Sequence, residues 1–140
     1  MLPGYVAQFG IPGDPAVGRA WLCPTCHRLD DEPRLASNSK LTLSFASGGK
    51  DTRQTQIFIN LSDNGGFPNF LDGQGFVPFG RVVQGADIVK SLHDGYGLVE
   101  AVSGGLAGGV SQSKAVYYGN EFLDAVYPKL SKIVRVTPII

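Results

Sequence analysis

The stretch Thr55-Gln56-Ile57-Phe58-Ile59-Asn60 alternates like a β-strand and is the part of the sequence that decides the fold. Successive side chains of a strand point to opposite faces, so the two isoleucines share one face, whereas Gln56, Phe58 and Asn60 share the other. An amide, an aromatic ring and a second amide on one face are unusual for plain solvent exposure. Composition alone would more often place the chain's amide and aromatic set in the core, and this set comprises Tyr5, Gln8, Gln56, Phe58, Phe70, Leu71 and Phe76.

Four further stretches of the chain have the pattern of strands. In Lys40–Phe45, Leu41, Leu43 and Phe45 alternate with polar residues, which predicts one buried face and one wet face. We also expect strands at residues 5–9 and 78–83, and a last strand at 133–136. This density of short strands, together with many turn-forming residues, favours a mainly β fold.

The remaining segments are read as helices and loops. The stripe of Ile88, Val89 and Leu92 predicts a short amphipathic helix at 87–92, and Asn120 is a candidate cap for a second helix that runs to Val126. Turn-forming residues predict a loop at 10–20 and irregular structure at 21–39. A glycine-rich loop is expected at 94–113, within one domain that spans residues 1–140.

Composition excludes several functional classes. The 140 residues include twelve Lys and Arg and twelve Asp and Glu, so no net positive field attracts nucleic acid. No apolar run approaches the roughly 20 residues that a membrane span needs, and no signal peptide is recognisable. We expect a monomer with no nucleic-acid or membrane partner, and the absence of a signal in this chain favours the cytoplasm.

Cys23-Pro24-Thr25-Cys26-His27 has the CxxCH pattern of c-type haem attachment. Haem attachment needs an export route, and the only methionine, Met1, does not suit the usual distal position. A zinc site would need ligands from elsewhere, with His93 the only other histidine. The alternatives left open are a surface loop with two incidental thiols, a redox-active cysteine pair and, more remotely, a haem protein.

Other catalytic patterns find no support in the chain. No phosphate-binding loop is present, because no Gly-Lys-Ser/Thr follows the glycines, and neither histidine lies in a recognisable triad context. No pair of carboxylates stands out from the acidic segment Asp30-Asp31-Glu32. Hydrolase chemistry is therefore not indicated.

Several segments resemble the cyclophilin-type peptidyl-prolyl isomerases in order and spacing. They are Leu2-Pro3-Gly4-Tyr5-Val6-Ala7-Gln8, Leu43-Ser44-Phe45-Ala46, Thr52-Arg53-Gln54-Thr55-Gln56-Ile57-Phe58-Ile59-Asn60, Phe70-Leu71-Asp72-Gly73 and Phe79-Gly80-Arg81-Val82-Val83-Gln84-Gly85. Residues 118–123 and 128–130 are similar to the tail of a divergent branch of the family. Five ordered segments are far more specific than one motif.

The resemblance implies an antiparallel β-barrel with capping helices and a groove that binds proline-containing peptides or unfolded protein clients, without metal or organic cofactor. It implies that the groove catalyses rotation of X-Pro bonds and so assists protein folding. By position, Phe58, Gln8 and Gln56 carry the catalytic roles. The residues expected to bind substrate are Tyr5, Val6, Ala46, Ser47, Phe70, Leu71 and Phe76.

The chain also departs from the family pattern. The catalytic arginine of the family lies upstream of the position that matches Met1, so we expect a domain incomplete at its N-terminus and poorly stable alone. Phe70 replaces the family tryptophan, and Gly75 and Phe76 stand where the groove histidine usually lies. Arg53 is the nearest candidate to substitute for the arginine. The alternative function is a proline-peptide binding module that has lost catalysis.

Overall fold

The computed structural model describes residues 1–22, 28–97 and 109–139. Its elements, in chain order, are β1 (Val6–Phe9), α1 (Pro15–Ala20), β2 (Thr42–Phe45), β3 (Ile57–Asn60), β4 (Pro78–Arg81), α2 (Ala86–Lys90) and α3 (Gln112–Val126). The predicted mainly β fold class is confirmed. The CxxCH motif with Cys23, Cys26 and His27, and the greater part of the 94–113 loop, lie outside the described residues.

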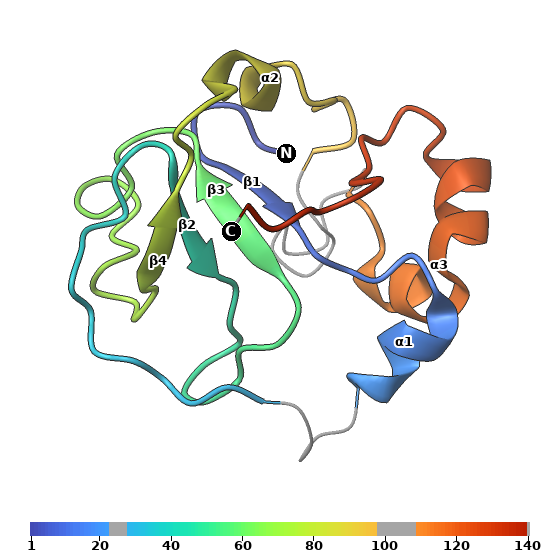
Figure 1. Cartoon of the computed structure of the whole chain (residues 1–140), viewed down its shortest axis with the longest axis horizontal. Helices are drawn as coiled ribbons and strands as arrows, with labels where there is room; N and C mark the ends of the chain where they lie inside the picture. Colours follow the sequence, from blue (N-terminus) through green and yellow to red (C-terminus); the bar gives the residue numbers. More distant parts are fainter. Residues whose placement is uncertain (23–27, 98–108, 140) are drawn as a thin grey trace.

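The four strands form one antiparallel sheet in the order β1-β3-β2-β4 (Figure 1). Phe58 of β3 lies between Gln8 of β1 and Ser44 of β2 in the register, so these three side chains share one face. A bulge between Leu43 and Ser44 interrupts the pairing of β2 with β4. Within the described ranges the sheet is open, with β1 and β4 at its edges, rather than a closed barrel.

The core lies on the Phe58 face of the sheet. Phe58 is only 4% exposed and packs with Val6 of β1 and with Leu71 from the loop that follows β3. Tyr5, Ala46 and Phe76 surround this cluster and are partly buried. The alternation of β3 therefore places the Phe58 side chain in the core. The amide side chains of Gln56 and Asn60 lie on either side of it along the same face.

The prediction that the Leu41, Leu43 and Phe45 face of β2 is buried and the polar face wet is wrong. Ser44 is 0% exposed, whereas Leu43 and Phe45 are only partly buried. The polar face is covered because the Ser44 hydroxyl donates to Asn38 Oδ1 at 2.7 Å inside the fold. Phe45 instead packs against Phe79 of β4, with ring centroids 4.8 Å apart.

Three buried asparagines and two of their hydrogen-bond partners join the loops to the sheet. We call this set the asparagine network, and it consists of Asn38, Asn60, Asn64, Ser44 and Asp72. Asn38 Nδ2 donates to Asp72 Oδ1 at 2.7 Å and to the carbonyl of Phe76 at 2.9 Å. Asn64 Nδ2 donates to Asn60 Oδ1 and to the carbonyl of Tyr5, both at 2.8 Å. Buried polar groups that are fully paired rigidify a structure, so this network holds the backbone around the core cluster.

Asp72 is the charged member of the asparagine network. Burial alone would raise the pKa of its carboxyl, but hydrogen bonds from Asn38 and Ser37 and the charge of Arg34 outweigh burial and hold the pKa below its ordinary value. Arg34 Nη1 lies 3.2 Å from Asp72 Oδ2. The ionised carboxylate therefore stabilises the segment from Arg34 to Asn38 against the loop after β3.

The helices lie beside the sheet. Figure 1 shows α1 and α3 next to one another, beyond β1, and α2 at the top of the view, near the N-terminus. The loop predicted at 10–20 contains α1, because Asp14 caps it by accepting from the amide of Ala16 at 2.8 Å and Pro15 begins it. None of the described helices is long and apolar enough to cross a membrane.

α3 begins at Gln112, eight positions earlier than the predicted cap at Asn120. Gly119 interrupts the helix with a φ of 61°, a conformation that favours glycine, and an added Cβ there would overlap the carbonyl of Gly13. The Asn120 amide instead donates to that carbonyl at 2.9 Å. The strand predicted at 133–136 is also wrong, since this segment has no strand pairing and Val134 is 98% exposed.

Asn38→Ala should lower the free energy of unfolding by about 2–4 kcal/mol, because it removes the acceptor of the Ser44 and Asn60 side chains and one donor to each of Asp72 and the Phe76 carbonyl. Urea unfolding followed by fluorescence measures the change. The neighbouring exposed Ser39→Ala should change it by less than about 0.5 kcal/mol. Equal effects of the two substitutions would contradict a stabilising role for the asparagine network.

Asp72 should make stability depend on pH in the acidic range. Because its folded-state pKa lies below the ordinary value of 3.8, the carboxylate stabilises the fold above about pH 4, and this contribution is lost as the pH falls through the folded-state pKa. In urea titrations, Asp72→Asn should be less stable than the parent near neutral pH, and the difference should shrink below about pH 3.5. Glu121→Gln, at an exposed carboxylate on α3, should leave the profile unchanged.

Candidate functional site

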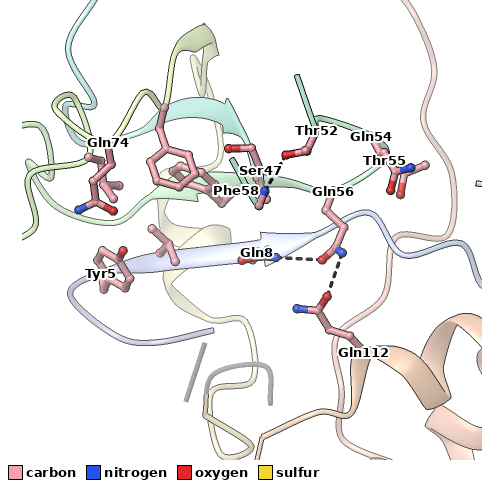
Figure 2. A pocket seen from close by; sticks show the side chains of 15 residues that line it. Tyr5, Gln8, Ser47, Thr52, Gln54, Thr55, Gln56, Phe58, Gln74 and Gln112 are labelled. Atoms are coloured by element: carbon pink, nitrogen blue, oxygen red, sulfur yellow. Dashed lines mark hydrogen bonds between the residues drawn. The ribbon is translucent and has the colours of Figure 1, made fainter. Parts of the chain in front are cut away.

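A cavity of about 470 Å³ opens on the Phe58 face of the sheet (Figure 2). Strands β1 and β3, the loop between β2 and β3, the loop after β3 and the first residue of α3 all contribute to it. Its lining residues are Tyr5, Val6, Gln8, Ala46, Ser47, Gly48, Thr52, Gln54, Thr55, Gln56, Phe58, Leu71, Gln74, Phe76 and Gln112. This volume accommodates a ring and the peptide groups on either side of it.

One end of the cavity is apolar. The Phe58 and Phe76 rings meet edge to face with centroids 5.6 Å apart, and Leu71 packs beside them. Tyr5 borders the same end, and burial raises the pKa of its phenol, which therefore stays neutral and keeps its proton near pH 7. The result is a rigid apolar wall with one hydroxyl at its edge.

The other end of the cavity carries side-chain amides. Gln8 Nε2 donates to Gln56 Oε1 at 2.9 Å, and Gln56 Nε2 donates to Gln112 Oε1 at 3.1 Å. Figure 2 shows Gln56 bonded to Gln8 of β1 on one side and to Gln112, at the start of α3, below it. We call these residues the glutamine chain.

Backbone geometry explains why these groups meet. Gln56 lies directly before β3, two residues from Phe58, and both side chains line the same cavity. Gln8 pairs directly with Phe58 across the sheet. The Ala46 amide donates to the Gln56 carbonyl at 3.0 Å, which brings the loop after β2 over the same face. The hydroxyl of Thr52 accepts from the Gly48 amide at 2.9 Å and closes that loop as a wall of the cavity.

All the predicted site residues except Phe70 line this cavity. Phe70 is 53% exposed, has a φ of 53° and packs against Phe67 with ring centroids 6.0 Å apart. The left-handed backbone at Phe70 turns its ring away while its neighbour Leu71 enters the core. The prediction that Phe70 belongs to the groove is therefore not supported by its position.

Sequence reasoning missed the polar residues that complete the cavity. Thr52 and Gln54 lie just before the predicted strand and Thr55 is its first residue, so their closeness to Gln56 was a usable signal. Gln54 Nε2 also donates to the carbonyl of Trp21 at 2.7 Å, which connects the cavity wall to the end of α1. Gln112 is more than fifty residues from Gln56 in sequence, and no local pattern marks it.

Arg53 does not supply a cation to the cavity. Its side chain is 4% exposed, and its Nε and Nη1 lie 3.5 Å from Asp31 and 3.9 Å from Glu32 respectively. The Leu29 amide donates to the Arg53 carbonyl, so the acidic segment crosses beside β3 and engages the guanidinium there. Among the described residues that line the cavity, none is an arginine or a lysine.

The cavity is arranged for non-covalent binding. Its described lining contains no histidine, cysteine or carboxylate. In residues 1–22, 28–97 and 109–139, no group of three or more His, Cys, Asp or Glu side chains is positioned to hold a metal ion. What the cavity offers is an apolar wall opposite hydrogen-bonding amides, which suits a substrate with an apolar ring next to a peptide group.

Comparison with known protein families agrees with this geometry. A family model described as cyclophilin type peptidyl-prolyl cis-trans isomerase/CLD matches residues 2–104. The match includes all four strands and every cavity residue except Gln112. The chain therefore belongs to the cyclophilin-type peptidyl-prolyl cis-trans isomerases, enzymes that act on proline-containing peptides.

Proposed function

We propose that the 470 Å³ cavity is the isomerase site and that it rotates X-Pro bonds without a covalent intermediate. The proline ring lies against Phe58, Leu71 and Phe76, and the flanking peptide groups hydrogen-bond to Gln8 and Gln56. Ala46 and Ser47 border the path of the peptide backbone. Proline-containing segments of unfolded protein clients are the expected substrates, and assistance to protein folding is the expected role.

The energy barrier to X-Pro rotation explains why an apolar wall and hydrogen-bonding amides are useful in an isomerase site. Rotation about the X-Pro bond meets roughly 20 kcal/mol because the amide is conjugated. The site lowers this barrier only if it binds the twisted amide more tightly than either planar isomer. A rigid aromatic wall that holds the ring, together with amide groups that hold the carbonyl side, restrains the two halves of the bond separately and favours the twisted geometry.

The observation that carries the proposal is the meeting of an apolar end and an ordered amide end in one cavity. The core cluster orders the first, and the hydrogen bonds at 2.9 and 3.1 Å order the second. Preorganised groups cost little to arrange when substrate binds. This supports catalysis by positioning.

A proline-peptide binding module is the second candidate function. It is favoured by the fact that no described lining residue is cationic, while Arg53 is engaged by Asp31 and Glu32. A cation that donates toward the imide nitrogen is the usual way to stabilise a twisted X-Pro amide electrostatically. Without one, the same cavity would bind proline peptides and leave the rotation rate unchanged.

A protease-coupled assay on an X-Pro peptide, run beside an NMR titration with the same peptide, separates the two functions. The isomerase proposal predicts both a shift of resonances on peptide addition and acceleration over the spontaneous rate. Binding without acceleration would favour the binding module. Absence of both would contradict any function of the cavity in proline recognition.

Phe58→Leu should weaken peptide binding about tenfold, because it removes part of the apolar wall against which the proline ring packs. The matched control is Phe79→Leu on β4, where a half-exposed ring packs on Phe45 and lies outside the cavity. Dissociation constants from the NMR titration, compared at equal folded fraction by urea unfolding, measure the effect. Equal affinities of the two variants would contradict the placement of the proline.

A further inference from the structure

We infer that Gln112 is a positioning residue for the isomerase site, which sets the orientation of the Gln56 and Gln8 amides. This inference rests on the proposed function of the cavity. Gln112 lies at the start of α3, outside the segment that the family model matches. It lines the cavity, and its side chain accepts a hydrogen bond from Gln56 there.

The direction of the glutamine chain is the key observation. An amide side chain donates through its nitrogen and accepts through its oxygen, and a half-turn about its last bond exchanges the two. Gln112 Oε1 accepts from Gln56 Nε2, so Gln56 Oε1 is turned toward Gln8 and accepts from Gln8 Nε2. The acceptor at Gln112 thus orients the Gln56 amide, and the Gln56 amide orients the Gln8 amide.

This direction determines which polar atom reaches the substrate. Because Gln8 uses Nε2 to reach Gln56, its Oε1 has no partner among the described residues and is available as an acceptor. If Gln56 were reversed, its nitrogen would face Gln8, and the Gln8 amide would have to turn its Oε1 toward that nitrogen to keep the hydrogen bond. Gln8 would then present Nε2, a donor, instead of a free acceptor. The orientation at Gln112 therefore controls whether Gln8 offers a free acceptor at the cavity.

Contacts of α3 with the segment after β1 and with α1 hold Gln112 in place. Its helix is joined to the segment after β1 by the hydrogen bond from the Asn120 amide to the Gly13 carbonyl, and Gly18 of α1 packs closely against Val116. The Ala115 amide donates to the Ser111 carbonyl at 2.9 Å in the first turn of α3. Helix docking thus holds the Gln112 acceptor within reach of β3.

The test replaces Gln112 in two ways. Gln112→Met keeps length and removes the acceptor, whereas Gln112→Glu keeps an acceptor and cannot donate. We expect Gln112→Met to lower kcat/KM about three- to tenfold, the range of one neutral hydrogen bond, mainly through kcat. Gln112→Glu should retain most of the parent value. Lys114→Met, at an exposed position two residues further along α3, should leave kcat/KM and stability unchanged.

The side-chain amide resonances of Gln56 and Gln8 give a readout that does not depend on activity. We expect both pairs to shift in Gln112→Met and to keep parent-like positions in Gln112→Glu, with equal melting temperatures for all variants. Unchanged amide resonances in Gln112→Met, or equal impairment of the Met and Glu variants, would overturn the inference. If the parent itself neither binds nor isomerises the peptide, the proposed function fails, and the resonances alone decide whether Gln112 orients the chain.

Discussion

The buried hydrogen bonds of Asn38 are the interaction on which the rest of the structure depends. One side chain accepts from Ser44 and Asn60 on the sheet and donates to Asp72 and the Phe76 carbonyl on the loop after β3. Loops carry few apolar contacts of their own, so a short sheet needs such a link to keep them in place. This side chain therefore helps to hold the loop that supplies Leu71 and Phe76 over Phe58.

The same network reaches the site at three backbone positions. It holds the Tyr5 carbonyl through Asn64, the Phe76 carbonyl through Asn38, and the Leu71 amide, which donates to the Asn64 carbonyl. These three residues form the apolar end of the cavity. The polar groups that hold the loops and the apolar groups that line the cavity are therefore adjacent. At the opposite end of the cavity, the hydrogen bonds of the glutamine chain order the amides.

Local patterns predicted the strands well and the buried polar residues badly. Alternation at Gln56 and Phe58 correctly placed both on one face, because a strand's two-residue period depends only on local geometry. The same rule failed for Ser44, because a hydroxyl is buried when a distant partner satisfies it, and Asn38 lies outside the strand. Phe70 and Leu71 show that local patterns do not predict which of two neighbouring apolar side chains is buried. The left-handed backbone at Phe70 accompanies an exposed Phe70 ring and a buried Leu71 side chain.

Residue patterns along the chain were enough to predict the mainly β class, the family and the apolar residues of the cavity, because strand periodicity and the ordered segments are local properties of the chain. Only the tertiary structure decided that Arg53 is engaged by the acidic segment and that Gln112 completes the amide chain. Both depend on contacts between residues far apart in sequence. Such contacts are selected by packing and by the pairing of buried polar groups, which no short stretch of sequence specifies.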